Sequence, residues 1–166
     1  MPLSPELESH RPPRLPGHAY DSGAYFVTFN TAGRVPLLGA VHGGRMELSP
    51  EGRIVEREWL HTMHLRTDVT TDAWVVMPDH FHGIVILHPS PAARAAGRTF
   101  SLGAVMAGFK AACTSAINRH RGTPGAAVWQ SRYYDRVIHD LAAMESIRRY
   151  IRDNPMAWEN DRSRRR

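Results

Sequence analysis

The fold of this chain depends on one stretch, Met77-Pro78-Asp79-His80-Phe81-His82-Gly83-Ile84-Val85-Ile86-Leu87. Val, Ile and Leu dominate its second half, which predicts a buried β-strand after the proline. Side chains alternate across a strand, so His80 and His82 should share one face with Ile84, while Phe81 points to the other. Buried imidazoles need partners. Either each histidine is hydrogen-bonded, or the two bind a metal together.

The size and composition of the chain are those of one ordinary globular domain. Its 166 residues suffice for a hydrophobic core without disulfides. The single cysteine, Cys113, excludes internal disulfides and cysteine-based zinc sites, which fits a reducing cytoplasm. No apolar run is long enough to cross a bilayer, and the proline-rich N-terminus has no signal-peptide core. We therefore expect a cytoplasmic protein that makes no membrane contact.

Positive charge is the clearest compositional signal. The formal net charge is +5, and almost all of the positive charge is arginine, because Lys110 is the only lysine. Arginine binds phosphate through paired hydrogen bonds, so nucleic acid is the partner to expect. An arginine-rich solvated surface explains the same composition equally well, since net charge alone indicates only non-specific attraction.

Strand and helix patterns follow one another in an α+β order. Strands are predicted at 25–30, 72–77 and 128–138 in addition to the histidine strand, and the short pieces 37–41 and 45–48 predict either a small hairpin or an irregular edge. Helices are predicted to begin after the caps Ser49, Ser101 and Asp140, and to end near His64, at Gly122 and at Asn154. This order predicts helices packed on a mainly antiparallel sheet.

The domain organisation is expected to be simple. Residues 1–19 contain five prolines and predict a flexible N-terminal arm. A single catalytic domain is expected over residues 20–158, with a flexible linker at 89–97. Residues 159–166 end in arginines and predict a disordered basic tail.

The third predicted helix offers a further ligand for the histidine pair. Tyr150 and Asn154 are spaced i, i+4, so they lie on one helix face about one turn apart. The amide oxygen of Asn154 can bind a hard metal, and the hydroxyl of Tyr150 can act as a nucleophile. With a metal that neutralises and orients a phosphate, these groups describe a phosphodiester-cleaving site. Spacing alone leaves a second interpretation open, in which Asn154 caps the helix and Tyr150 packs.

Three motifs occur in a characteristic order. They are the strand 77–83, the segment Val128-Trp129-Gln130-Ser131-Arg132-Tyr133-Tyr134, and Tyr150-Ile151-Arg152-Asp153-Asn154-Pro155. The ordered set resembles the IS200/IS605-like Y1 transposases, most closely their REP-associated tyrosine transposase branch. The likeness runs from about Tyr20 to Trp158, which is most of the chain.

This resemblance implies a fold, a site and a reaction. The fold would be the HUH endonuclease fold, a ferredoxin-like antiparallel sheet with helices packed on it. His80 and His82 match the family's metal-binding pair, Tyr150 its catalytic tyrosine, and Asn154 its polar third metal ligand. The family uses Mg²⁺ or Mn²⁺ to cleave single-stranded DNA beside a hairpin. The tyrosine becomes joined to the 5′-phosphate and leaves a free 3′-OH, so that rejoining needs no ATP.

Further roles are expected for residues around this site. Asp79 is expected either to orient an imidazole from behind or to cap the turn after Pro78. DNA contacts are expected from polar and basic side chains, each of which has a solvated surface as its alternative: Lys110, Gln130, Arg132, Arg148 and Arg149. The chain departs from the family where relatives often carry Ile-Arg, because Ile138-His139 stands there. Tyr133 and Tyr134 are competing nucleophiles, but neither has a ligand at i+4, so packing or base stacking is expected for them.

Two other functions fit the same residues. One is a domesticated protein that recognises DNA hairpins without cutting them, although an intact set of His80, His82, Tyr150 and Asn154 speaks against such drift. The other is a metallonuclease that uses water and forms no adduct with DNA. A homodimer is possible, because the third helix could complete a site in its own chain or in a partner. Association with the bacterial nucleoid is expected for the transposase.

Overall fold

The computed structural model describes residues 23–88, 91–96 and 101–164. The predicted N-terminal arm, residues 1–19, lies outside the described residues. Within the described residues no helix is both long enough and apolar enough to cross a membrane.

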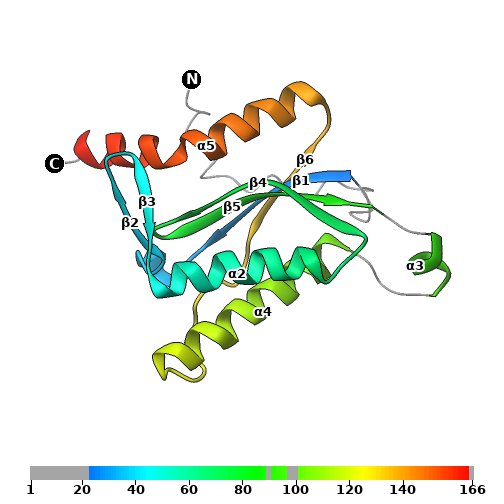
Figure 1. Cartoon of the computed structure of the whole chain (residues 1–166), viewed down its shortest axis with the longest axis horizontal. Helices are drawn as coiled ribbons and strands as arrows, with labels where there is room; N and C mark the ends of the chain where they lie inside the picture. The colour runs from blue at the N-terminus through cyan, green and yellow to red at the C-terminus, as the bar shows by residue number, and fades with distance from the viewer. Residues whose placement is uncertain (1–22, 89–90, 97–100, 165–166) are drawn as a thin grey trace.

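A four-stranded antiparallel sheet forms the centre of the molecule (Figure 1). Its strands are β1 (Gly23–Asn30), β4 (Val69–Met77), β5 (His80–Leu87) and β6 (Tyr134–Ile138), in the order β4-β5-β1-β6. β4 and β5 form a hairpin in which Met77 pairs with His80, so proline and aspartate make a two-residue turn at the start of the histidine strand. The predicted antiparallel α+β fold is confirmed.

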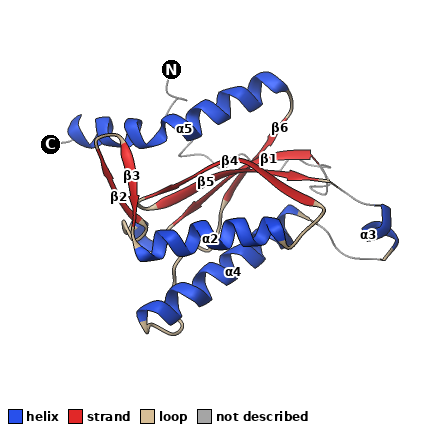
Figure 2. Ribbon diagram, viewed as in Figure 1, coloured by secondary structure: helices blue, strands red, loops and turns tan. Residues whose placement is uncertain are grey.

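The principal helices cover the two faces of this sheet unequally (Figures 1 and 2). α2 (Pro50–His64) and α4 (Leu102–Arg121) lie together on one face, and α5 (Leu141–Arg164) lies on the other. All three predicted caps are confirmed. The side chains of Ser49, Ser101 and Asp140 accept hydrogen bonds from the backbone N–H groups three residues later, and Gly122 ends α4 in the left-handed region at φ 65°.

Alternation along the strands divides the buried residues into two clusters. Phe81 packs with α2 and α4 in the larger cluster, which also holds Tyr25, Val27 and Phe29 of β1. Ile84 belongs to the smaller cluster under α5. The two faces predicted for the histidine strand are therefore confirmed, because successive side chains along a strand point to opposite faces of the sheet.

Short elements connect and brace the sheet. β2 (Gly39–His42) and β3 (Arg45–Leu48) pair as the predicted hairpin, and it stands between the end of α5 and the start of α2 (Figure 1). A single 3-10 turn, Ala32–Arg34, follows β1. The region expected to be a linker contains a short helix, α3 (Pro91–Ala95).

The predicted end of the third helix is wrong. α5 continues through Pro155 to Arg164, so residues 159–164 of the expected disordered tail are helical. Proline disfavours the helix before it and removes a hydrogen bond, but here Pro155 is buried against the rest of the fold. The next turn is held by Glu159, whose carboxylate accepts the backbone N–H groups of Gly43 and Gly44 at 3.0 and 2.5 Å. These tertiary contacts outweigh the local preference.

The strand predicted at 128–138 is also shorter in the structure. Only Tyr134–Ile138 pairs along β1, and Trp129 makes one isolated bridge with Thr31. Between them, the backbone N–H of Gln130 donates to the carbonyl of Asn30 on β1 at 2.9 Å. The carbonyls of Gln130 and Ser131 accept hydrogen bonds from Lys110 on α4.

Candidate active site

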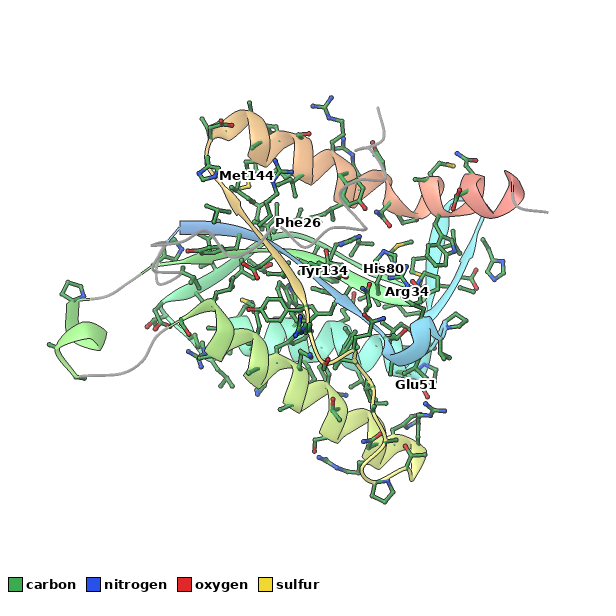
Figure 3. All side chains as sticks on the ribbon, turned by 180° about the vertical axis from the view of Figure 1, so that it is seen from behind. Phe26, Arg34, Glu51, His80, Tyr134 and Met144 are labelled. Carbon is green, nitrogen blue, oxygen red and sulfur yellow. The ribbon has the colours of Figure 1, made fainter. Side chains whose placement is uncertain are left out.

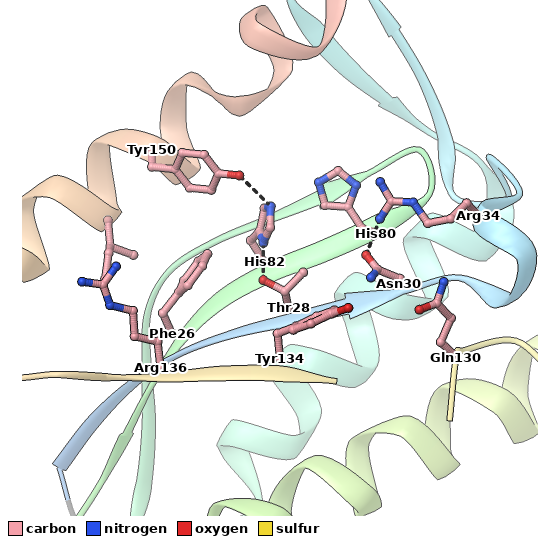
Figure 4. Close-up of a pocket in the computed structure, with 11 residues that line it drawn as sticks. Phe26, Thr28, Asn30, Arg34, His80, His82, Gln130, Tyr134, Arg136 and Tyr150 are labelled. Atoms are coloured by element: carbon pink, nitrogen blue, oxygen red, sulfur yellow. Dashed lines mark hydrogen bonds between the residues drawn. The ribbon is translucent and has the colours of Figure 1, made fainter. Parts of the chain in front are cut away.

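The strand register gathers polar side chains at one place on the α5 face. His82 pairs with Thr28, which in turn pairs with Tyr134, and His80 pairs with Asn30. Residues paired across antiparallel strands point to the same face, so these side chains meet between the sheet and α5. They line a pocket of about 290 Å³ that Tyr150 closes from α5, as Figure 4 shows.

His80 is held in one tautomer by the turn that precedes it. Its Nδ1 lies 2.6 Å from Oδ1 of Asp79, and a carboxylate can only accept, so Nδ1 carries the proton. In the neutral form of this ring, Nε2 then carries the lone pair. This atom is buried without a hydrogen-bond partner. An unpaired acceptor in a buried place is costly unless something binds it, and neutral imidazole nitrogen is a good metal ligand.

His82, two residues further along β5, is also a buried histidine whose Nδ1 has a fixed partner. Its Nδ1 lies 2.8 Å from the hydroxyl oxygen of Thr28, and its ring centroid lies 4.6 Å from that of His80. Burial, followed by the electrostatic effects of the neighbouring His80 and Arg34, holds the pKa of His82 well below its ordinary range. His82 is therefore neutral at physiological pH, which is the form that binds a metal.

The long helix α5 supplies the other face of the site. The Tyr150 hydroxyl lies 3.5 Å from Nε2 of His82, and the Trp158 ring lies 5.6 Å from the His80 ring. Asn154 lies four residues after Tyr150 and four residues before Trp158, and it is buried. Helical spacing therefore places Asn154 on the face of α5 that covers the two histidines.

These residues fit a divalent metal. Among the described residues, no three His, Cys, Asp or Glu side chains lie together in a way that could hold a metal. A site at the histidine pair therefore needs a ligand of another type, and an asparagine amide oxygen suits Mg²⁺ or Mn²⁺. The unpaired Nε2 of His80 and the neutral His82 provide the nitrogen ligands.

The protein shows similarity to two known proteins, although no family model matches its sequence. An uncharacterised protein of Haemophilus influenzae is 28% identical over 169 residues, which cover 93% of each chain. A solved REP-associated tyrosine transposase bound to a REP hairpin superposes with a TM-score of 0.61 and 21% identity, over 82% of this chain and 68% of the other. The protein has the fold of that tyrosine transposase. The predicted likeness in fold is thus confirmed.

Within this transposase fold the predicted DNA-contact residues differ in their surroundings. Gln130 lines the pocket. Lys110 is engaged by the backbone carbonyls of residues 130 and 131, and Arg148 binds both carboxylate oxygens of Asp72 at 2.7 and 2.8 Å. These contacts give both cations a structural role without DNA, and neither lines the pocket. Arg132 and Arg149 are exposed outside the pocket.

Several pocket residues of the transposase fold were missed by the sequence analysis. They are Thr28 and Asn30 on β1, Arg34 after it, and Arg136 on β6 (Figure 4). Figure 3 also shows Arg34 near His80. A signal for the first two was present, because polar residues alternate with the apolar residues of β1. Arg34 and Arg136 could not be found in this way, because the chain has many arginines. The 3-10 turn after β1 brings Arg34 to the site, and the register of β6 against β1 brings Arg136 there.

Proposed function

We propose that the protein is a metal-dependent single-stranded DNA endonuclease and strand transferase that acts as a transposase at hairpin-flanked sites. Tyr150 is its nucleophile, and His80, His82 and Asn154 hold Mg²⁺ or Mn²⁺. Asp79 fixes the tautomer of His80. The main support is the position of the Tyr150 hydroxyl, 3.5 Å from one metal-binding histidine and beside a second whose buried Nε2 is unpaired.

The proposed reaction exchanges one phosphodiester for another. The Tyr150 oxygen attacks phosphorus and loses its proton, the bond from phosphorus to the 3′-oxygen breaks, and that oxygen leaves as a 3′-OH after taking up a proton. The bound metal supplies charge neutralisation at the phosphate and helps to orient it. Because the number of phosphodiester bonds is unchanged, a 3′-OH can reverse the step without ATP.

The geometry of α5 supports Tyr150 over the other tyrosines. Tyr150 projects from a helix that lies against the histidines, and its ring forms a T-shaped contact with the ring of Phe26, with the two centroids 6.0 Å apart. Tyr134 lies on the opposite wall of the pocket, on β6. Tyr133 packs against Phe29 in the larger core, with the two ring centroids 5.2 Å apart. Among the tyrosines in the described residues, only Tyr150 combines a place in the pocket with a neighbouring Asn154 on the same helix face.

Covalent adduct formation tests this proposal. The purified protein is incubated with Mn²⁺ and single-stranded DNA from the sequence flanking its own gene, labelled at the 3′ end, and analysed on a denaturing gel. We expect a protein–DNA adduct that is absent in Tyr150→Phe and present in Tyr133→Phe and Tyr134→Phe. An adduct formed by Tyr150→Phe would overturn the assignment. Cleavage without an adduct would instead indicate a hydrolytic nuclease.

Calorimetric titration tests the metal site independently of DNA. We expect wild-type protein to bind Mn²⁺, and His80→Ala and Asn154→Ala to bind it at least tenfold more weakly, because each loses one ligand. His61→Ala on α2 is a matched control, since it removes a histidine away from the pocket. Equal Mn²⁺ affinity of His80→Ala and His61→Ala would show that the metal does not bind in this pocket.

A hairpin-binding protein that does not cut is the second candidate. Its support is that the similar solved structure is described as bound to a REP hairpin. It predicts that a hairpin oligonucleotide binds the protein, while no adduct forms with any divalent metal.

A further inference from the structure

Arg34 has an unusual backbone conformation beside the proposed metal site. Its φ is 55°, and it is the one non-glycine residue with positive φ in the described part of the chain. Left-handed conformations are unfavourable for residues with a Cβ, and they concentrate at sites where the side chain has a function. The position itself is well fixed, because Thr31 donates from its backbone N–H to the carbonyl of Asp79 at 2.9 Å.

The guanidinium of Arg34 is oriented by two partners in the pocket wall. Nε lies 3.1 Å from Oδ2 of Asp79, and a terminal nitrogen donates to Oδ1 of Asn30. Asp79 thus joins Arg34 to His80, since its other oxygen accepts from His80 Nδ1. Five N–H donors form the arginine fork, so donors remain for a further acceptor. Figure 4 shows the fork beside the His80 ring.

A purely structural role does not explain this arrangement. The Arg34 side chain is 45% exposed, and an ion pair with an exposed arginine contributes little to stability. Asp79 already has a partner in His80. Asn30 accepts through its oxygen, which leaves its amide nitrogen as a second donor lining the same pocket. The strained arginine and its neighbour therefore present donors to an anion.

We infer that Arg34, supported by Asn30 and Asp79, binds a non-bridging oxygen of the DNA phosphate that Tyr150 attacks. This inference rests on the proposed cleavage reaction for the identity of the phosphate. The Arg34 fork holds the phosphate next to His80 and His82, and Asp79 sets the positions of the arginine and of His80 together. Arginine suits this task, because its planar donors match the geometry of a phosphate and it stays charged.

A charge scan of the DNA backbone tests the inference without cleavage. In the absence of divalent metal, Tyr150→Phe protein is titrated with single-stranded DNA from the sequence flanking its own gene, in which one phosphate at a time is replaced by an uncharged methylphosphonate. We expect one position at which the replacement weakens binding about ten- to a hundredfold. Adding Arg34→Ala should weaken binding of unmodified DNA and abolish the effect at that position. Adding Arg57→Ala, which removes an exposed ion-paired arginine from α2, should leave the profile unchanged.

Two more variants separate binding from folding. Glycine adopts positive φ readily, so Arg34→Gly should unfold at an equal or higher urea concentration than wild type and still lose the phosphate effect. Arg34→Lys keeps one charge without the fork and should restore part of the binding. If Arg34→Ala and Arg34→Gly both unfold at a lower urea concentration than wild type, and DNA binding is lost only together with this loss of stability, the role of Arg34 is structural and the inference is overturned.

The remaining outcomes distinguish this inference from the proposed function. A methylphosphonate profile without any sensitive position, or one that Arg34→Ala leaves intact, overturns the role of Arg34. Normal adduct formation by wild type would still support the nucleophile in that case. Conversely, an Arg34-dependent phosphate in a protein that forms no adduct would uphold the phosphate site and reject the cleavage reaction.

Discussion

The two faces of the central sheet differ in what they are built for. On the α2 and α4 face, Phe81 lies against Trp59 at 4.7 Å and Phe109 at 5.6 Å between ring centroids, with no exposed surface. On the α5 face the apolar cluster is small, and next to it the sheet carries imidazole, hydroxyl and guanidinium groups around a pocket. One face holds the fold together, and the other carries the candidate chemistry.

This division runs through consecutive residues of a single strand. His80 and His82 face α5, while Phe81 between them fills the larger core. A rigid aromatic core behind the strand fixes the backbone on which both imidazoles stand. Sites on such supported strands keep their geometry better than sites on loops. The strained loop at Arg34 is the exception, and hydrogen bonds from Thr31 and Leu38 to the turn carbonyls of Asp79 and Pro78 hold that loop in place.

The largest expected effect on stability comes from the core face. Phe81→Ala leaves a cavity among Trp59, Phe109 and Phe29, and should lower the free energy of unfolding by about 3–5 kcal/mol. Tyr150→Phe removes one half-buried hydroxyl, the proposed nucleophile, from the other face. This substitution should change the free energy of unfolding by less than about 1 kcal/mol. Urea unfolding measures both values. Similar losses in the two variants would contradict the division between the faces.

A smaller effect is expected from adding one methyl group to the histidine strand. A Cβ at Gly83 would lie 2.8 Å from a ring carbon of Trp59 and 2.9 Å from one of Phe81, inside the packed core. Gly83→Ala should therefore destabilise the fold by about 1–3 kcal/mol. Gly108→Ala on α4 is the matched control, because a Cβ there meets nothing within 4 Å. It should stabilise the helix by about 0.5–1 kcal/mol, so equal unfolding midpoints would contradict the packing.

Much of the fold was predictable because local patterns decide it. The faces of the histidine strand, the hairpin at 39–48 and the caps at Ser49, Ser101 and Asp140 follow from side-chain period and hydrogen-bonding chemistry. The end of α5 was not predictable in this way. Pro155 argues locally for a stop, and the contacts of Glu159 with the Gly43-Gly44 turn come from a distant part of the chain.

The candidate site was predictable only in part, for a similar reason. Spacing placed Tyr150 and Asn154 on one helix face, and the strand period paired the histidines. Strand register then decides which other side chains join them, and register cannot be obtained from composition. Arg148, expected at DNA, binds Asp72, while Arg34 and Arg136 reach the pocket instead. The roles of all these residues in cleavage stay predictions.

The smallest expected effect concerns how α5 is attached to the edge of the sheet. Asp72 lies where the pairing of β4 with β5 shifts, and its carboxylate binds Arg148 of α5 through two hydrogen bonds. These hydrogen bonds, opposed by burial, hold the pKa of Asp72 below its ordinary value of 3.8. A lowered pKa means that the folded protein binds the proton less tightly than the unfolded chain. The stabilisation is therefore present above about pH 4 and is lost as the pH falls through the folded pKa.

Asp72→Asn keeps the shape of the side chain and removes this charge. At pH 7 it should lower the thermal midpoint by about 1–2 °C, because the pair is only half-buried and solvent screens it. The difference from wild type should shrink as the pH falls below about 4, and it should vanish below the lowered pKa of Asp72, where both side chains are uncharged. Asp153→Asn in the exposed pair with Arg152 is the matched control and should shift nothing at either pH. A midpoint difference between wild type and Asp72→Asn that persists undiminished at pH 3 would mean that shape, and not charge, attaches α5 to the sheet.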